Sequence, residues 1–229
     1  CKEITFVGEV SKEKKLNTVY IGGGTPTTLE PEQLERLLSH IEKTFSFEDL
    51  KEFTVEAGRP DSITKEKLEV LRRHQISRIS INPQTMQQKT LDCIGRKHTV
   101  EDIRQVYAMA RELGFENINM DLIAGLPGET LDDMKDTLRQ IEMFAPDSLT
   151  VHALAMKRAS RLTQEKREGS YQGNDQADSA AMLSEMIELA AEYAGKMQLV
   201  PYYLYRQKNI AGNFENVGYA KVDKAGIYN

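Results

Sequence analysis

The sequence has very little cysteine and no tryptophan. Its 229 residues include two cysteines, Cys1 and Cys93. A disulfide-rich secreted domain needs several paired cysteines, so this class is excluded and a reducing compartment is expected. No stretch reaches the roughly 18 consecutive apolar residues that a membrane-spanning helix requires, and no secretory signal is visible. We therefore expect a cytoplasmic protein with no membrane partner.

An excess of positive charge is also absent. The chain holds 30 lysines and arginines against 35 aspartates and glutamates, which gives a formal net charge of -5. Proteins that bind nucleic acid usually carry a basic surface, so we expect no nucleic-acid partner. The hydrophobic share of 40% is ordinary for a globular protein, and the length suits one large domain or two small ones.

Short β-rich runs alternate with longer helical patterns along the chain. The predicted strands are residues 18–21, 53–56, 78–81, 118–123, 149–154 and 202–205, and the predicted helices are residues 31–45, 64–74, 100–113, 131–144 and 176–198. Residues 157–175 are polar and predict a long loop. This alternation is typical of a parallel sheet covered by helices, either a barrel or a doubly wound sheet. In both, ligands bind at the carboxyl ends of the strands.

Three glycines follow the first predicted strand directly. Gly22, Gly23 and Gly24 precede Thr25 and Pro26. Glycine lets backbone N–H groups approach a ligand without interference from side chains, although a glycine run can also form a simple tight turn. The position after a strand favours contact with a ligand.

Polar side chains stand at or near the ends of the next three strands. Glu56 can accept hydrogen bonds from an amine or from ribose hydroxyls, or it can pair with Arg59. Gln84 offers both a donor and an acceptor, or it holds its loop together. Asp121 lies in an otherwise apolar strand, where an unpaired carboxylate would be costly. Four successive strands that end in this way indicate one extended ligand across the sheet.

A basic cluster follows a short helical pattern. Arg96, Lys97 and His98 are adjacent, and they form either a solvated loop or a contact to a carboxylate, for which arginine is well suited. Residues 125–128, Gly-Leu-Pro-Gly, lead into a predicted helix, whose N-terminus favours anions.

These strand ends resemble the radical S-adenosylmethionine superfamily over residues 17–219. The segments that carry the resemblance are residues 22–26, 54–56, 79–84, 94–96 and 119–127, and they are most similar to the branch of oxygen-independent coproporphyrinogen III oxidases. Residues 201–209 and 213–219 resemble the variant of that branch called coproporphyrinogen dehydrogenase in Gram-positive bacteria. The resemblance implies an α/β fold, an incomplete parallel (β/α) barrel of the radical S-adenosylmethionine type.

The resemblance also implies the site and the reaction. The cofactor S-adenosyl-L-methionine would bind at Gly23, Gly24, Thr25, Glu56, Gln84, Arg96, Asp121 and Ala155. Catalytic residues are not identified. The implied oxidoreductase activity, in haem biosynthesis, converts two propionates of coproporphyrinogen III to vinyl groups by oxidative decarboxylation and gives protoporphyrinogen IX. The implied partners are this porphyrinogen and a reduced flavodoxin or ferredoxin-type electron donor.

One departure from the family is large. The three-cysteine motif Cys-x3-Cys-x2-Cys, which holds a [4Fe–4S] cluster in the intact enzymes, is absent, so no metal ligand is predicted in this chain. Cys1 has no partner at that spacing, and Cys93 shares a helical apolar face with Leu91 and Ile94, which predicts core packing. We expect a fragment whose first strand and cluster loop would precede Cys1, and which alone would be inactive. Its predicted domains are residues 1–200, a partial barrel, and residues 201–229, the start of a C-terminal extension.

Two other functions remain open on this sequence. One is a haem chaperone of the same branch, which keeps the fold but transfers haem. The other belongs to a different class, a phosphate-binding barrel enzyme whose glycine turn holds a phosphate group.

Overall fold

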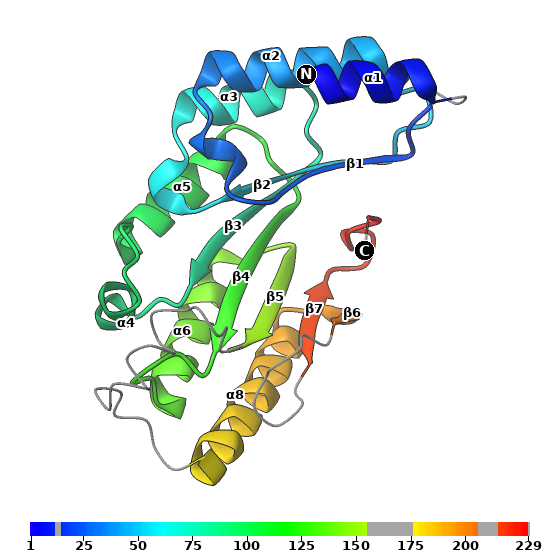
Figure 1. The fold of residues 1–229 in the computed structure, drawn as a ribbon. Helices are drawn as coiled ribbons and strands as arrows, with labels where there is room; N and C mark the ends of the chain where they lie inside the picture. Colours follow the sequence, from blue (N-terminus) through cyan, green and yellow to red (C-terminus); the bar gives the residue numbers. More distant parts are fainter. Residues whose placement is uncertain (12–14, 155–175, 206–214, 229) are drawn as a thin grey trace. The chain divides into compact units, whose positions relative to one another are not determined.

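The structure is a computed structural model that describes residues 1–11, 15–154, 176–205 and 215–228 (Figure 1). Its strands are β1 (Thr18–Ile21), β2 (Glu52–Gly58), β3 (Arg78–Gln84), β4 (Ile118–Ala124), β5 (Ser148–Ala153), β6 (Val200–Tyr205) and β7 (Asn216–Ala220). Its helices are α1 (Lys2–Val10), α2 (Pro31–Thr44), α3 (Lys65–Arg73), α4 (Gln88–Cys93), α5 (Val100–Glu112), α6 (Leu131–Phe144) and α8 (Gln176–Lys196), with short 3-10 turns η1 (Pro26–Thr28) and η2 (Pro60–Ser62). The loop predicted at residues 157–175 lies outside the described residues.

The strands form one seven-stranded sheet in the order β1-β2-β3-β4-β5-β7-β6. β1 and β2 pair in parallel, with Thr18 opposite Glu52, and β2 pairs in parallel with β3. β7 pairs antiparallel with both β5 and β6. The predicted α/β class with alternating strands and helices is confirmed, and the antiparallel strand is a feature that the sequence did not indicate.

Strands β2 and β3 each have one apolar and one polar face. In β2, the buried side chains of Phe53, Val55 and Ala57 alternate with Glu52, Thr54 and Glu56. The Thr54 hydroxyl donates to Glu52 Oε1 at 2.8 Å, so these two side chains share the polar face. In β3, the polar row consists of Arg78, Ser80, Asn82 and Gln84. Buried parallel strands are usually hydrophobic on both faces, so a polar row indicates a face that receives water or a ligand.

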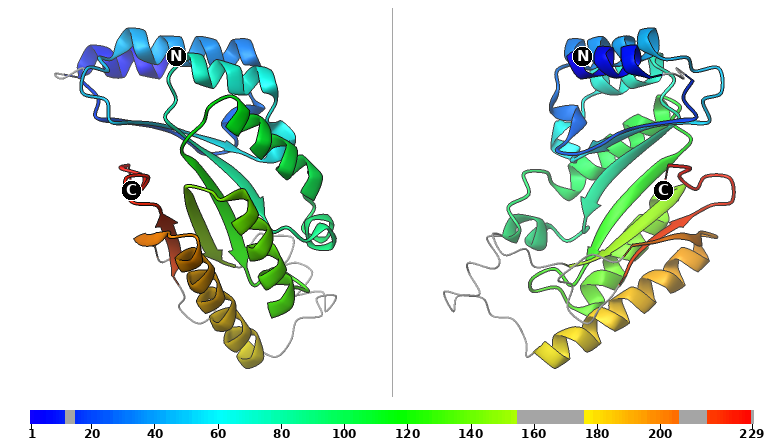
Figure 2. Two further views of the ribbon diagram at one scale, coloured as in Figure 1. Left: turned by 180° about the vertical axis from the view of Figure 1, so that it is seen from behind. Right: turned by 45° about the vertical axis from the view of Figure 1, so that its right-hand side comes forward.

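The chain divides into two compact units, and the first holds residues 1–82, 101–119 and 226–229. Its buried core residues include the apolar side chains of β2, the stripe Leu34, Leu38 and Ile41 of α2 and the leucines of α3, and α2 packs against α3. α1 lies beside α2 (Figure 2). A Cβ on Gly8 would lie 2.3 Å from Thr44 Cγ2, so glycine allows this close approach of the two helices.

The second unit holds residues 83–100 and 120–225. Helices α6 and α8 pack against each other, and α8 also contacts β5 (Figure 2). The core joins Leu122 of β4, Leu138 of α6, Leu149 of β5 and Met186 of α8, all fully buried. Among the described residues, no helix has the length and apolar character needed to cross a membrane.

Local capping explains where several helices begin and end. Pro31 occupies the first turn of α2, as predicted, and the Thr64 side chain accepts from the N–H of Lys67 at the start of α3. Thr130 and Asp133 form a reciprocal capping box at the start of α6. Gly114 directly follows the predicted helix of residues 100–113; it has a φ of 84° and lies just after α5.

Candidate functional site

The glycine turn directly follows β1. Gly23 and Gly24 have φ values of 77° and 45°, a conformation that side-chain-bearing residues rarely adopt. A Cβ at either position would meet nothing within 4 Å, so space is open beside the turn. Gly22 differs, because a Cβ there would lie 2.5 Å from Tyr20 Cε1 and 2.9 Å from Glu56 Oε2. The turn therefore needs glycine for conformation at two positions and for space at the third.

Glu56 faces this turn from β2. One carboxylate oxygen accepts a hydrogen bond from the Tyr20 hydroxyl, and the other accepts from the backbone N–H of Gly23 at 3.2 Å. Arg59, the alternative partner considered from the sequence, instead lies 3.4 Å from Asp61. The structure thus brings Glu56 and the glycine turn together within the first unit, while their role in binding stays a prediction.

The end of the glycine turn is held by a buried lysine. The Thr25 hydroxyl donates to the Gly24 carbonyl at 2.7 Å. The Lys67 ammonium group, 8% exposed, donates to the carbonyls of Thr27 at 2.7 Å and Ser62 at 3.1 Å. Hydrogen bonds from a charged donor are stronger than neutral ones, so Lys67 fixes the turns after β1 and β2.

In the second unit, Gln84 is the last residue of β3 and is buried with a φ of 70°. Glu129 supports this strand end, because its Oε1 accepts from the hydroxyl of the adjacent Thr85 at 2.6 Å. Glu129 is 3% exposed, and burial raises the pKa of its carboxyl group. The sequence analysis missed Glu129, although it directly follows the Gly-Leu-Pro-Gly turn.

Asp121 lies in the middle of β4, on the half-buried face that it shares with Ile123. The other residues of β4 are apolar apart from Asn119, as the sequence indicated, and the role of Asp121 in binding stays a prediction. Arg96 follows α4 and is half-buried, and its N–H donates to the Leu91 carbonyl at 2.9 Å. The preceding Gly95, with a φ of 70°, closes the helix.

Two sequence-based expectations around α4 are corrected. Cys93 is exposed, because α4 directs Leu91 inward and leaves Cys93 on its outer side. His98 is 1% exposed, and its Nε2 lies 3.4 Å from the Pro83 carbonyl oxygen, so it does not extend the basic cluster into solvent. Ala155 lies outside the described residues.

The residues of the chain suit one of the two implied cofactors, S-adenosylmethionine, and do not suit the other, the [4Fe–4S] cluster. Glu56 and the open glycine turn offer a carboxylate and backbone groups, which suit the ammonium and carboxylate of an amino acid such as the methionine part of S-adenosylmethionine. A [4Fe–4S] cluster does not fit, because three thiolates are needed and the sequence has two cysteines, both exposed. Within the described part of the chain, no group of three or more histidine, cysteine, aspartate or glutamate residues could hold a metal ion.

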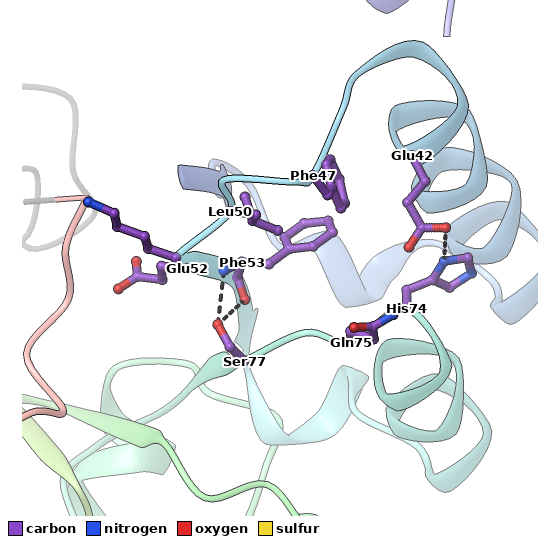
Figure 3. Close-up of a pocket in the computed structure, with 9 residues that line it drawn as sticks. Glu42, Phe47, Leu50, Glu52, Phe53, His74, Gln75 and Ser77 are labelled. Atoms are coloured by element: carbon purple, nitrogen blue, oxygen red, sulfur yellow. Dashed lines mark hydrogen bonds and ion pairs between the residues drawn. The ribbon is translucent and has the colours of Figure 1, made fainter. Parts of the chain in front are cut away.

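A pocket of about 340 Å³ lies in the first unit (Figure 3). It is built at the start of β2, around Glu52 and Phe53, whereas Glu56 lies further along the strand. Figure 3 shows the imidazole of His74 directed at Glu42, and the two groups are 3.0 Å apart. No residue predicted for the cofactor site lines this pocket.

The chain belongs to the radical SAM superfamily, whose profile matches residues 5–141, more than half of the chain. This membership agrees with the glycine turn after β1 and with the alternation of strands and helices.

Within this superfamily, the chain is similar to two curated relatives. The chain is 46% identical over 230 residues to the oxygen-independent coproporphyrinogen-III oxidase-like protein HemZ of Bacillus subtilis, covering 99% of this chain and 45% of the relative. It is 39% identical over 143 residues to the heme chaperone HemW of Bacillus subtilis, covering 62% of this chain and 38% of the relative. The chain thus spans less than half the length of either relative.

A solved structure confirms the fold. The coproporphyrinogen III oxidase HemN from Escherichia coli, a radical SAM enzyme, superposes with a TM-score of 0.79 at 24% identity, covering 97% of this chain and 47% of HemN. The predicted resemblance to the radical S-adenosylmethionine superfamily and its coproporphyrinogen oxidase branch is confirmed. The family membership also decides against the phosphate-binding barrel as the class of protein.

Proposed function

We propose that this chain binds S-adenosylmethionine through its glycine turn and Glu56, as part of an enzyme that decarboxylates the propionates of coproporphyrinogen III. The observation that carries the proposal is the Glu56 carboxylate, held 3.2 Å from the Gly23 N–H beside an open turn. When bound at an iron–sulfur cluster, S-adenosylmethionine supplies a radical that removes a hydrogen atom from a substrate carbon. The residues of this chain bind and orient the reactants.

Six of the eight predicted residues have a proposed role that follows from their chemistry. Glu56 attracts the ammonium group of the cofactor, and the open backbone of Gly23 and Gly24 allows its close approach. Gln84 and Asp121 hydrogen-bond the nucleoside part, the first as donor and acceptor and the second as acceptor from ribose hydroxyls. Arg96 pairs with a carboxylate, for which its planar guanidinium is suited.

The names of the relatives support the substrate. HemZ is called coproporphyrinogen-III oxidase-like, and HemN is a coproporphyrinogen III oxidase. In the proposed reaction, each of two propionates passes a hydrogen atom from carbon to the radical derived from S-adenosylmethionine, releases carbon dioxide, passes one electron to an external one-electron acceptor, and becomes a vinyl group. A reduced flavodoxin or ferredoxin-type protein is the proposed electron donor.

A second candidate function is a haem chaperone. It is favoured by the 39% identity to the heme chaperone HemW. The decisive experiment supplies the complete, cluster-loaded protein anaerobically with coproporphyrinogen III, S-adenosylmethionine and a reductant, and separately titrates it with haem. Protoporphyrinogen IX formation supports the oxidase, whereas stoichiometric haem binding without this product supports the chaperone.

The cofactor site is tested by replacing its carboxylates. Glu56→Ala and Asp121→Ala should each weaken S-adenosylmethionine binding to the complete protein, measured by calorimetry. The loss of a hydrogen bond to a charged group costs about 1.5–3 kcal/mol, roughly ten- to a hundred-fold in affinity. Asp61→Ala is the matched control, because this acid pairs with Arg59 and is not among the residues predicted to bind the cofactor. Unchanged affinity in both test variants would contradict the proposed site.

A further inference from the structure

We propose that Tyr20 and Tyr228 are positioning residues, which hold the Glu56 carboxylate on the glycine turn and so set the affinity for the amino-acid end of S-adenosylmethionine. The inference rests on the proposed function for the identity of the ligand. It is carried by a chain of contacts within the first unit, which runs from the C-terminal segment through the two tyrosines to Gly23.

The first link is between Tyr20 and Glu56. The Tyr20 hydroxyl donates to one oxygen of Glu56, while the other oxygen accepts from the Gly23 N–H at 3.2 Å. Both contacts restrain the same carboxylate, one from β1 and one from the turn. Without the Tyr20 hydroxyl, Glu56 keeps one of these two restraints, and its side chain gains rotational freedom.

The second link is between the two tyrosine rings. The Tyr228 ring stacks on the Tyr20 ring, with centroids 3.9 Å apart and an interplanar angle of 11°. β1 has four residues, all of them half-buried, and it stands at the end of the sheet order. The stacked ring therefore adds a restraint to a side chain on a strand of only four residues.

The third link anchors the C-terminal segment itself. The N–H of Ile227 donates to Glu52 Oε2 at 2.7 Å. Glu52 is 5% exposed, and its other oxygen accepts from the Thr54 hydroxyl. A hydrogen bond to a buried carboxylate is strong, so it fixes the backbone directly before Tyr228. β2 thus anchors this segment at Glu52 and presents the positioned carboxylate at Glu56.

The test measures ligand affinity in the complete, cluster-loaded protein with two ligands. S-adenosylmethionine carries the amino-acid end, and 5′-methylthioadenosine lacks it. Tyr228→Ala and Tyr20→Phe should each weaken S-adenosylmethionine binding by about two- to ten-fold, as expected for one aromatic or hydrogen-bond contact. Neither should change the affinity for 5′-methylthioadenosine. Tyr228→Phe keeps the stacked ring and should bind both ligands as the unaltered protein does.

Hydrogen–deuterium exchange supplies a readout that needs no ligand. Tyr228→Ala and Tyr20→Phe should speed exchange in peptides covering residues 22–25 and leave peptides from β3 unchanged. Tyr205→Ala is the matched control, because it removes a tyrosine of similar exposure, 49% against 51%, that stacks on Tyr203 in the second unit. It should change neither the exchange of residues 22–25 nor the affinity.

The outcomes separate this inference from the proposed function. If Glu56→Ala weakens S-adenosylmethionine binding but the two tyrosine variants change neither affinity nor exchange, the positioning role is wrong and the cofactor site stands. If the tyrosine variants weaken both ligands equally, their effect is general and the positioning role is again wrong. If Glu56→Ala leaves affinity unchanged, the proposed cofactor site fails, and faster exchange would still show that the tyrosines hold the turn.

Discussion

Glu129 is a buried acid whose protonation should make the stability of the protein depend on pH. Burial raises its pKa above the ordinary value of 4.5, so the folded state keeps a proton that the unfolded state has lost. Stability therefore falls as the pH rises from 4.5 through the raised pKa. At higher pH the loss of stability persists, because Glu129 is then ionised while buried. Glu129→Gln removes this titration and keeps an acceptor for Thr85.

We expect Glu129→Gln to be more stable than the unaltered chain at pH 8 and to lose the decline between pH 5 and 8. Each unit by which the pKa is raised is worth about 1.4 kcal/mol. Urea unfolding at both pH values measures the effect, and Glu142→Gln, at an exposed position of α6, serves as the control. A variant less stable than the unaltered chain at pH 8 would contradict the argument.

For single residues, the sequence predicted which chemical groups lie at the site better than it predicted their contacts and burial. The approach of Glu56 to the glycine turn could be anticipated, because the turn follows β1 and Glu56 lies towards the carboxyl end of the neighbouring parallel strand β2. The contacts of Tyr20 could not, since they depend on Tyr228, which is about 200 residues away in the sequence. The burial of His98 was missed for a similar reason, because its ring packs against the end of β3.

Helices α2 and α3 are joined by a histidine between two glutamates. His74 Nε2 lies 2.8 Å from Glu35, and Nδ1 lies 3.0 Å from Glu42. Carboxylates only accept hydrogen bonds, so the imidazole is the donor in these contacts. Arg73 and then His74 lower the pKa of Glu35, so its contribution to stability is present above pH 4.5 and is lost as the pH falls through the lowered pKa.

His74→Leu should reduce the free energy of unfolding by about 1.5–3 kcal/mol, because it removes a buried imidazole that lies within hydrogen-bond distance of two carboxylates. Arg73→Gln should cost less than about 1 kcal/mol, since this arginine is exposed and its ion pair is screened by water. Urea denaturation at pH 7 compares the two. If both variants lost the same free energy of unfolding, the buried histidine would contribute no more to the packing of α2 against α3 than the exposed arginine does.

At the scale of elements, the strands and long helices were predicted almost throughout. The prediction of residues 18–21 matches β1, and that of residues 131–144 matches α6. β7 was missed because its five residues include Gly218, and the strand depends on pairing with β5 and β6. α1 was missed because it is rich in β-branched residues and contains Gly8, which lowers helix propensity.

At the scale of the whole molecule, the number of cysteines limits whether this chain can bind a [4Fe–4S] cluster. We expect the chain as given, reconstituted anaerobically with iron and sulfide, to bind no stoichiometric [4Fe–4S] cluster, because two exposed cysteines cannot supply three thiolates. It should form no 5′-deoxyadenosine from S-adenosylmethionine under a strong reductant. A longer chain that adds the three-cysteine segment should do both. Near-stoichiometric cluster absorbance in the chain alone would overturn this prediction.

The domain boundary at residue 201 stays a prediction. β6 and β7 lie in the same sheet as β5, and the chain passes between the two compact units at residues 82–83, 100–101, 119–120 and 225–226. The ends of helices and strands can be predicted from local sequence. The boundaries of a compact unit cannot, because such a unit depends on contacts between segments that are distant in the sequence.

The alternation of polar and apolar side chains along β2 and β3 implies a pattern in how the protein tolerates change. In a saturation mutagenesis library scored separately for abundance and for activity, the two scores should oscillate along each strand with a period of two and in opposite phase. Substitutions at Val55 or Ile79 should lower abundance, and substitutions at Glu56 or Gln84 should lower activity while the protein still accumulates. Neighbouring positions of one strand would then be constrained for different reasons, one by the need to fold and the next by the need to bind and react.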